Sequence, residues 1–240
     1  MDSIFGLSTI ITYDLTYYGH SCFLLETKGC KILFDPFITP NALAENIDVD
    51  SIEADYILIT HGHADHVADA VKIAKRTGAM VISNFEIVTW LQNQGIKNCH
   101  PMNHGGSKEF EFGRLKYVNA VHSSSLPDGS YGGNPGGFVI IGEITLYHAG
   151  DTALSYDMKL LGDFFSIDVA LLPIGDNFTM GVEDAIIASD FIQCNNIIGM
   201  HYDTFEAIKI NKEAATFLFD NAMKALTLLE VGEALELVTD

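Results

Sequence analysis

The chain has 240 residues, of which 48% are hydrophobic and 10% aromatic, so it can build a sizeable core and is neither disordered nor fibrous. Its formal net charge of −19 produces a field that repels polyanions, which disfavours nucleic acid as a substrate. No apolar run approaches the roughly 20 residues that a membrane helix needs, so we expect no membrane-spanning segment. With nucleic acid disfavoured, the expected partner is a small-molecule substrate.

The first half of the chain is predicted to begin with strands and to continue as alternating strands and helices. Runs rich in Ile, Thr, Tyr and Leu predict the strands, and glycines close the two helical runs. The predicted strands are 9–18, 22–26, 31–34, 56–59 and 80–83, and the helices are 67–77 and 85–94. We expect a hairpin turn at Lys28-Gly29. Residues 37–53 are expected to form a loop long enough to be functional.

The second half is predicted to have the same order, with a strand meander first. Its predicted strands are 108–112, 115–121, 137–141, 144–148, 169–173, 196–200, 226–231 and 235–238, and its helices are 157–161, 183–192 and 211–224. We expect turns at Gly113-Arg114 and Gly142-Glu143. This order predicts two mixed β-sheets packed together with helices outside, a four-layer α/β sandwich. No repeat or linker divides the chain, so residues 1–240 are expected to form one domain.

Four metal-capable side chains lie close together, directly after the apolar run 56–59. They are His61, His63, Asp65 and His66. A buried strand followed by a helix places such residues at the carboxyl edge of a sheet, where α/β proteins usually carry their chemistry. Imidazole and carboxylate suit zinc, manganese and iron. His61 and His63 alternate and point to one side, whereas Asp65 and His66 lie on the turn into the helix, so we expect two metals. The alternative is a solvated His-rich loop.

Three later positions each follow a strand-like run, where a sheet edge would present their side chains. They are His122, Asp151 and His201. Together they supply a third imidazole for one metal, a third ligand for the other and a carboxylate to bridge them. Taken singly, each could equally be a capped turn or a satisfied core group.

This pattern resembles that of the metallo-β-lactamase superfamily, and the resemblance spans nearly the whole chain. It is carried by His61-x-His63-x-Asp65-His66, His122, Gly150-Asp151-Thr152 and His201. The segments 19–23, 32–37 and 148–152 are similar to its branch of small metal-dependent hydrolases. That branch is similar to L-ascorbate-6-phosphate lactonase and, more distantly, to N-acylphosphatidylethanolamine phospholipase D. The resemblance implies an αββα fold.

The resemblance also implies a role for each matched residue. It implies that His61, His63 and His122 hold the first metal, that Asp65, His66 and His201 hold the second, and that Asp151 bridges the two. Asp35 matches an aspartate that supports the metal-binding loop without binding metal, a role that ligating histidines require of an outer partner. The expected cofactors are two divalent ions, zinc first, with manganese and iron as alternatives.

Two divalent ions about 3.5–4 Å apart would share a water and lower its pKa toward neutrality. We therefore predict a metal-dependent hydrolase whose metal-bound hydroxide cleaves a small ester, lactone or phosphodiester. Asp65 is expected to orient that hydroxide or carry its proton. The alternative is a redox protein that performs iron-dependent oxygen or sulfur chemistry on the same fold. A non-catalytic binding protein ranks last, because no predicted ligand is missing.

A separate general acid would have to come from outside the ligand set. His20 and His148 are the candidates, because both lie in the segments that carry the resemblance. Hydrogen bonding behind the ligands or in the core is the alternative for each. His100 and His104 are expected at the surface or rim. Residues 123–137 start directly after His122, and we expect this glycine-rich loop to shape the substrate pocket, with a hairpin connection that does not touch substrate as the alternative.

The four cysteines show no CxxC pairing, so we expect them to be reduced and mostly buried. They are Cys22, Cys30, Cys99 and Cys194. The N-terminus lacks a basic segment followed by a long apolar one, so no signal peptide is predicted. Both observations favour a cytoplasmic enzyme. A homo-oligomer is left open.

Overall fold

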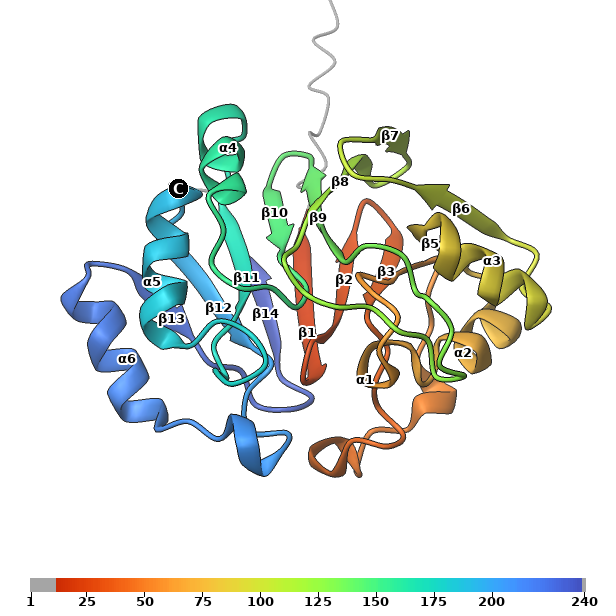
Figure 1. Ribbon diagram of the computed structural model, residues 1–240, viewed down its shortest axis with the longest axis horizontal. Coiled ribbons are helices and arrows are strands. Elements are labelled where there is room, and N and C mark those ends of the chain that lie inside the picture. The colour runs from red at the N-terminus through yellow and green to blue at the C-terminus, as the bar shows by residue number, and fades with distance from the viewer. Residues whose placement is uncertain (1–11, 239–240) are drawn as a thin grey trace, which may run out of the picture.

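The computed structural model describes residues 12–238 and contains two seven-stranded sheets (Figure 1). In spatial order, the first sheet is β14 (Ala234–Leu237), β1 (Tyr13–Gly19), β2 (Cys22–Thr27), β3 (Cys30–Phe34), β4 (Tyr56–Leu58), β5 (Met80–Asn84) and β6 (Cys99–Met102). The second is β13 (Ala225–Thr227), β12 (Asn196–Met200), β11 (Val169–Pro173), β10 (Thr145–His148), β9 (Gly136–Ile141), β8 (Gly113–Asn119) and β7 (Ser107–Phe110).

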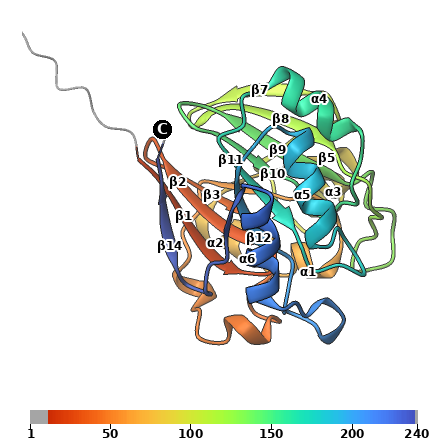
Figure 2. The same cartoon turned by 90° about the vertical axis from the view of Figure 1, so that its left-hand side faces the viewer.

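Helices cover the outer face of each sheet. The first sheet carries α1 (Ala64–Val67), α2 (Ala70–Thr77) and α3 (Phe85–Asn93), and the second carries α4 (Asp157–Phe164), α5 (Val182–Phe191) and α6 (Lys212–Asn221). The side view in Figure 2 shows α5 and α6 outside the second sheet. Three short 3-10 helices lie in loops: η1 (Ala42–Ala44), η2 (Val49–Ser51) and η3 (Glu206–Ile208).

Both sheets change from antiparallel to parallel pairing. Strands β1 to β3 form an antiparallel meander, and β3 to β6 are parallel. In the second sheet, β7 to β10 are antiparallel, and β10 to β13 are parallel. Parallel strands end at a common edge, so the loops that follow β4, β10 and β12 can meet there.

The core lies between the two sheets, and strand alternation builds it. On β2, Phe23 and Leu25 are buried in a cluster that includes Phe138 of the second sheet. Their neighbours Cys22 and Leu24 belong to a second cluster, which also contains residues of α2 and α3. Successive side chains of a strand point to opposite faces, so one strand serves both the central core and the helical layer. The four-layer sandwich predicted from the sequence is confirmed.

The helix predicted over 67–77 is present as α2 from Ala70 to Thr77, but it does not include Val67, which belongs to the separate helix α1. The Asp69 carboxylate between them accepts the backbone N–H groups of Ile38 and Thr39, both at 2.8 Å. The N–H of Asp69 donates to the carbonyl of Pro36. These bonds tie the loop after β3 to the end of α1, and a contact between distant segments interrupts the helix.

Other differences lie at the edges of elements. The strand β6, which contains His100, was not predicted; it forms at the edge of the sheet, where a proline without an N–H is tolerated. The predicted turn at Gly113-Arg114 comes earlier, since Gly113 already pairs with Phe110. The strand predicted over 226–231 is the shorter β13. The strand predicted over 9–18 is present from Tyr13 onward, and residues 9–11 lie outside the described part.

The four cysteines are free thiols, as expected, and only Cys99 is partly exposed. Burial raises the pKa of Cys194 to about 11, so this thiol stays protonated at neutral pH. Within residues 12–238, no helix has the length and apolar character that crossing a membrane requires.

Candidate metal centre

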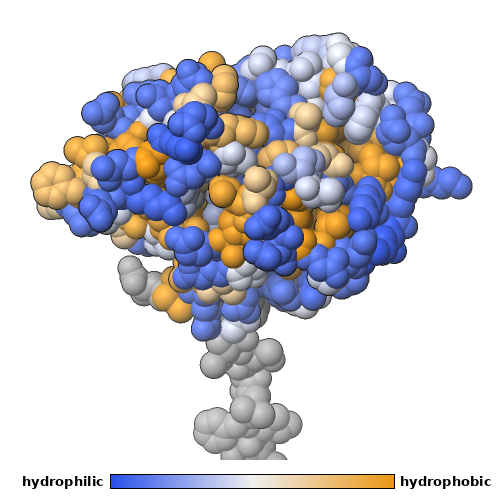
Figure 3. Space-filling view, turned by 90° about the horizontal axis from the view of Figure 1, so that it is seen from below, coloured by the Kyte–Doolittle hydropathy of each residue, from blue (hydrophilic) through white to orange (hydrophobic). Residues whose placement is uncertain are grey.

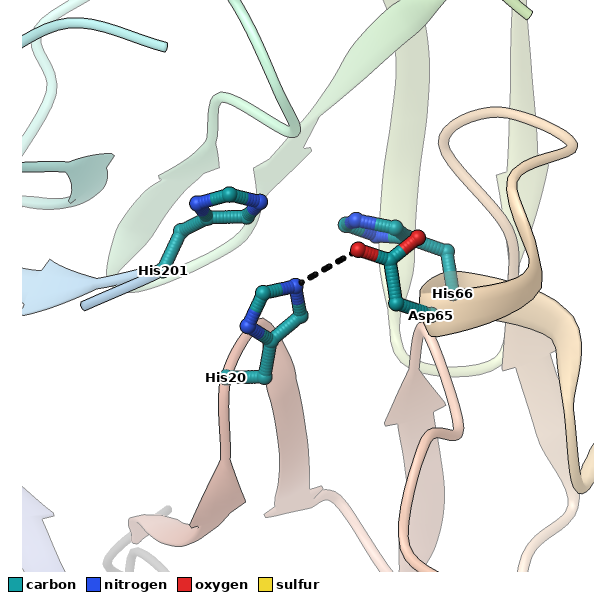
Figure 4. A group of neighbouring side chains, drawn as sticks. All are labelled: His20, Asp65, His66 and His201. Atoms are coloured by element: carbon teal, nitrogen blue, oxygen red, sulfur yellow. Dashed lines mark hydrogen bonds and ion pairs between the residues drawn. The ribbon is translucent and has the colours of Figure 1, made fainter. Parts of the chain in front are cut away.

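The predicted ligands meet at one edge of the two sheets, although they are far apart in the sequence. His61 and His63 follow β4, Asp65 and His66 lie on α1, His122 follows β8, Asp151 follows β10, and His201 follows β12. His20, in the turn between β1 and β2, joins them (Figure 4). The structure therefore brings all seven predicted ligands and one of the two candidate acids together.

The first group consists of three imidazoles. His61, His63 and His122 each offer a ring nitrogen, and these nitrogens all lie within 4.8 Å of one another. The His61 Nε2 and His63 Nδ1 atoms are 3.0 Å apart. The side chain of His122 is 15% exposed, whereas His61 is fully buried. Three converging imidazoles with one side open to solvent can hold a divalent metal and leave a position free for another ligand.

The second group adds a carboxylate to imidazoles. Asp65, His66, His201 and His20 also place their donor atoms within 4.8 Å of one another. Figure 4 shows Asp65 and His66 projecting from α1 toward His201, with His20 beside them. The side chain of Asp65 is 27% exposed, so a substrate or a water can reach it.

Asp151 lies between the two groups. Its Oδ2 atom is 2.9 Å from His201 Nε2, 3.5 Å from His122 Nε2 and 3.9 Å from His61 Nε2. Its Oδ1 atom is 3.3 Å from His66 Nε2. One buried carboxylate is thus within reach of imidazoles from both groups, which is the position that a bridging ligand would need.

Asp35 supports both groups from behind. It accepts the Thr60 N–H at 2.8 Å, the Thr60 hydroxyl at 2.7 Å and His66 Nδ1–H at 2.9 Å. Because the Thr60 hydroxyl donates to Asp35, its oxygen accepts from His61 Nδ1–H at 3.0 Å. These bonds occupy the Nδ1 atoms of His61 and His66, so their Nε2 atoms are aimed into the site, where a metal can take the place of a proton.

The carboxylates of the centre favour a positive charge between them. Burial alone would lower the pKa of His66, but Asp151 and Asp35 on its two sides raise that pKa well above its ordinary value. Burial would raise the pKa of Asp151, yet His66 and His201 hold it well below its usual range. Burial keeps the pKa of His61, His63 and His122 below the ordinary value, so these imidazoles are neutral and can donate lone pairs.

Unpartnered atoms test whether the residues fit a metal. His66 Nε2 and Asp151 Oδ1 are buried and have no hydrogen-bond partner among the described residues, although they lie 3.3 Å apart. Without a proton on Nε2, a lone pair on nitrogen would face a carboxylate oxygen there, and a metal cation between the two atoms would satisfy both. The donors and their geometry therefore fit a metal cation.

His20 contacts two members of the second group. Its Nε2 atom is 3.2 Å from Asp65 Oδ2, and its Nδ1 atom is 3.0 Å from the Thr204 hydroxyl. Its ring centroid is 4.0 Å from that of His201, and its carbonyl accepts the His201 N–H. Burial lowers the pKa of His20 to about 4 despite Asp65. Both His20 and His201 have a left-handed φ, near +57° and +55°, a conformation that costs a non-glycine residue free energy.

His148 lies outside the cluster. It is fully buried and stacks on Phe34, with ring centroids 4.8 Å apart. Its Nδ1 atom accepts the Gly150 N–H, so Nε2–H donates to the Ser21 carbonyl at 3.1 Å. Both ring nitrogens are used by the backbone, which favours the core alternative for this residue.

The loop 123–137 is built into the scaffold of the site. The Ser124 hydroxyl accepts the Gly62 N–H at 3.0 Å and donates to the Gly132 carbonyl at 2.9 Å. Leu126 is buried against Gly62, and the Trp90 indole donates to Asp128. The loop thus braces the turn that carries His61 and His63. His63 Nε2 is also 3.4 Å from the Ser123 hydroxyl at the start of the loop.

Two supporting residues could not be found from the sequence. Thr204 is 184 positions from His20, and Ser124 is 62 positions from Gly62. Only the fold brings these pairs together. His100 and His104, expected at the surface or rim, do not belong to either donor group: His100 packs against Phe110, and His104 donates to the Pro135 carbonyl.

Similar proteins share this chain's length and fold. Residues 14–201 match a family model described as a Beta-lactamase superfamily domain. A UPF0173 metal-dependent hydrolase of Flavobacterium johnsoniae is 57% identical over 224 residues, which span 93% of this chain and 99% of the relative. Another from Christiangramia forsetii is 56% identical over 225 residues, again 93% and 99%. Among solved structures, Igni18, a metallo hydrolase from Ignicoccus hospitalis, has a TM-score of 0.86 at 33% identity and covers 95% of this chain and 100% of that one.

Proposed function

We propose a dinuclear hydrolytic mechanism for this chain, which belongs to the metallo-β-lactamase superfamily and is a metal-dependent hydrolase. The first divalent ion would be held by His61, His63 and His122, and the second by Asp65, His66 and His201, with Asp151 shared between them. The two groups of converging donor atoms support this assignment. Zinc is our first choice of metal, because the donors are mainly imidazoles; manganese and iron accept the same set.

Bound there, two divalent ions would supply an activated water as the nucleophile and a Lewis acid for the oxygen of the scissile bond. The protein's own part is to hold and orient. Asp65 is the exposed carboxylate of the second group, and its Oδ2 atom is held by His20. We propose that Asp65 orients the attacking water or takes its proton. Asp35 and Thr60 keep the Nε2 atoms of His61 and His66 aimed into the site.

Of the two histidines predicted as a general acid, we keep only His20 as a candidate. His148 has both ring nitrogens bonded to backbone groups and is fully buried, so we give it no part in proton transfer. His20 lies beside Asp65 and could pass a proton only through that carboxylate. The substrate that we propose is a small ester, a lactone or a phosphodiester, in a cytoplasmic setting that the free cysteines support.

The observation that carries the proposal is the position of Asp151 between two separate donor groups. Elemental analysis of the purified protein should find two equivalents of a divalent metal per chain. With each of zinc, manganese and iron, the protein should be assayed on a panel of acyl esters, lactones and phosphodiesters.

Two variants complete this test. His61→Ala and Asp151→Ala should each abolish turnover and lower metal content, and His100→Ala, at a residue outside both donor groups, should change neither. Unchanged turnover in both site variants would refute the dinuclear mechanism. A redox-active iron spectrum in protein from its native source, without hydrolysis of any substrate, would favour the oxygen or sulfur chemistry instead.

A further inference from the structure

We infer that the substrate of this site is electrically neutral and presents an apolar or aromatic group, so that it is a carboxylic ester or lactone without phosphate. The inference rests on the proposed hydrolytic function and narrows it. It is carried by two features of the metal edge: the apolar side chains that surround the ligands, and the positions of the basic residues.

Three half-exposed apolar residues, which we call the rim, lie in loops that adjoin the predicted ligands or His20. They are Val121, Phe178 and Phe205, with 48%, 54% and 38% of their surface exposed. Val121 directly precedes His122, and its N–H donates to the hydroxyl of Thr152, which follows Asp151. The ring centroid of Phe205 lies 5.5 Å from that of His20 and 6.3 Å from that of Phe37.

Phe178 reaches the site through a short loop anchored on two ligand segments. At one end of this loop, Gly175 is so close to His201 that an added Cβ would lie 2.1 Å from the His201 carbonyl oxygen. At the other end, the Met180 N–H donates to the Thr152 carbonyl. A pairing of Gly175 with Gly181 closes the loop. The loop that carries Phe178 is therefore held near the metal edge by both ends.

These loops lie on the lower side of Figure 1, the side that Figure 3 views face on. Apolar residues are visible there between hydrophilic ones. Exposed aromatic surface next to a reactive centre offers a substrate burial of its own apolar group, at about 25 cal/mol per Å².

No arginine of the described chain serves this edge. The Arg76 guanidinium is bonded to Glu53 and the Ile52 carbonyl, and that of Arg114 donates to Ser107 on β7. Arginine forks are the groups that usually hold phosphate or carboxylate in a bidentate manner. A substrate with a phosphate away from its scissile bond would find no such clamp.

The lysines of the loop after His201 are already paired with carboxylates. Lys209 pairs with Glu206, and Lys212 pairs with Asp203 and Glu230. The same side of the molecule also carries Asp176, which is not a predicted ligand. The chain has a formal net charge of −19 without metal, and this strongly negative field disfavours an anionic group on the substrate.

Paired substrates with the same leaving group can test the inference on the metal-loaded full chain. p-Nitrophenyl butyrate is neutral, whereas p-nitrophenyl hemisuccinate has a similar acyl chain that ends in a carboxylate. We expect kcat/KM to be about tenfold higher for the neutral ester than for the anionic one. This ratio should increase as the salt concentration is reduced. Bis(p-nitrophenyl) phosphate should be a poorer substrate than either a neutral ester or a neutral lactone.

A charge introduced at the rim should reverse part of this preference. Phe178→Lys should raise kcat/KM for the hemisuccinate relative to the butyrate by about two- to tenfold. The matched control is Phe217→Lys on α6, at a phenylalanine that is 64% exposed and remote from the ligands, and it should leave the ratio unchanged. Titration calorimetry with inorganic phosphate gives a readout without turnover, and Phe178→Lys should tighten phosphate binding by a similar factor.

The outcomes separate the two proposals. Faster cleavage of the hemisuccinate or of the phosphodiester, or tight phosphate binding by the unaltered protein with no gain from Phe178→Lys, would overturn the neutral-substrate inference and leave the hydrolase standing. No turnover of any ester, lactone or phosphodiester by protein that holds two metals would overturn the proposed function. In that case the neutral-substrate inference would be tested only by the phosphate affinities of the unaltered protein and of Phe178→Lys.

Discussion

At the scale of single residues, His20 contacts predicted ligands without being one of them, so its role has to be explained. It is fully buried, has a left-handed backbone, and contacts Asp65 through its ring and His201 through both ring and backbone. The ring centroids of His20 and His201 are 4.0 Å apart, a spacing that the predicted ligands His61 and His66 nearly match at 4.1 Å. Both ring nitrogens of His20 are bonded to other side chains, Thr204 and Asp65, which favours a residue that positions the ligands over one that binds the metal itself.

Two substitutions that tolerate the left-handed backbone can test this role. His20→Gly removes the ring, and we expect the affinity for the second metal equivalent to fall by roughly 10–100-fold, as when ligands lose an outer partner. His20→Asn keeps an amide that can donate to Asp65 and should restore part of the affinity. Competition with a chelator measures both. Unchanged affinity with a lower kcat would identify His20 as the general acid instead.

Asp35 illustrates how one buried charge supports several groups. It accepts two bonds from Thr60 and one from His66, and it is fully buried. Asp35→Asn turns one acceptor into a donor that faces other donors, so we expect the free energy of unfolding to fall by about 1–3 kcal/mol. Urea denaturation of the metal-free protein measures it. Asp50→Asn, at an exposed pair with Lys72, is the control and should cost about 0–1 kcal/mol; an equal loss in both variants would contradict a special role for Asp35.

At the scale of elements, the loop 123–137 is predicted to control metal occupancy. Ser124→Ala removes the acceptor of the Gly62 N–H, so the turn with His61 and His63 should loosen, and metal content should fall after dialysis. Ser130→Ala, whose hydroxyl is bonded only to exposed Asp128, should retain its metal. If shortening the loop changes substrate preference but not metal content, the loop shapes the pocket and does not brace the ligands.

How well each element could be predicted depended on where its contacts come from. Strands such as β2 and β11 follow from their own apolar residues, and the cluster from His61 to His66 is local in sequence, so both were predictable. The break at Asp69 depends on the backbone of Ile38 and Thr39, about 30 positions away. Likewise, the contact of His20 with Thr204 and the bracing of Gly62 by Ser124 arise only when the two sheets are packed together.

At the scale of the whole molecule, the candidate site joins the two halves of the sandwich. His61, His63, Asp65 and His66 lie between β4 and α2 of the first sheet, whereas His122, Asp151 and His201 follow strands of the second. Each metal group draws on both sheets, since His122 completes the first group and His201 the second. A bound ion would therefore link the sheets as well as serve catalysis.

Removal of metal should consequently lower the stability of the whole domain. An ion present at about 1,000 times its Kd stabilises the folded state by about 4 kcal/mol, which corresponds to a Tm shift of about 8–16 °C for a chain of this size. Calorimetry with and without a chelator measures this shift. Asp151→Ala, which lacks the shared carboxylate, should respond to the chelator far less. If both proteins melt at the same temperature with and without metal, the ions do not link the sheets, because a ligand bound only to the folded state must raise its Tm.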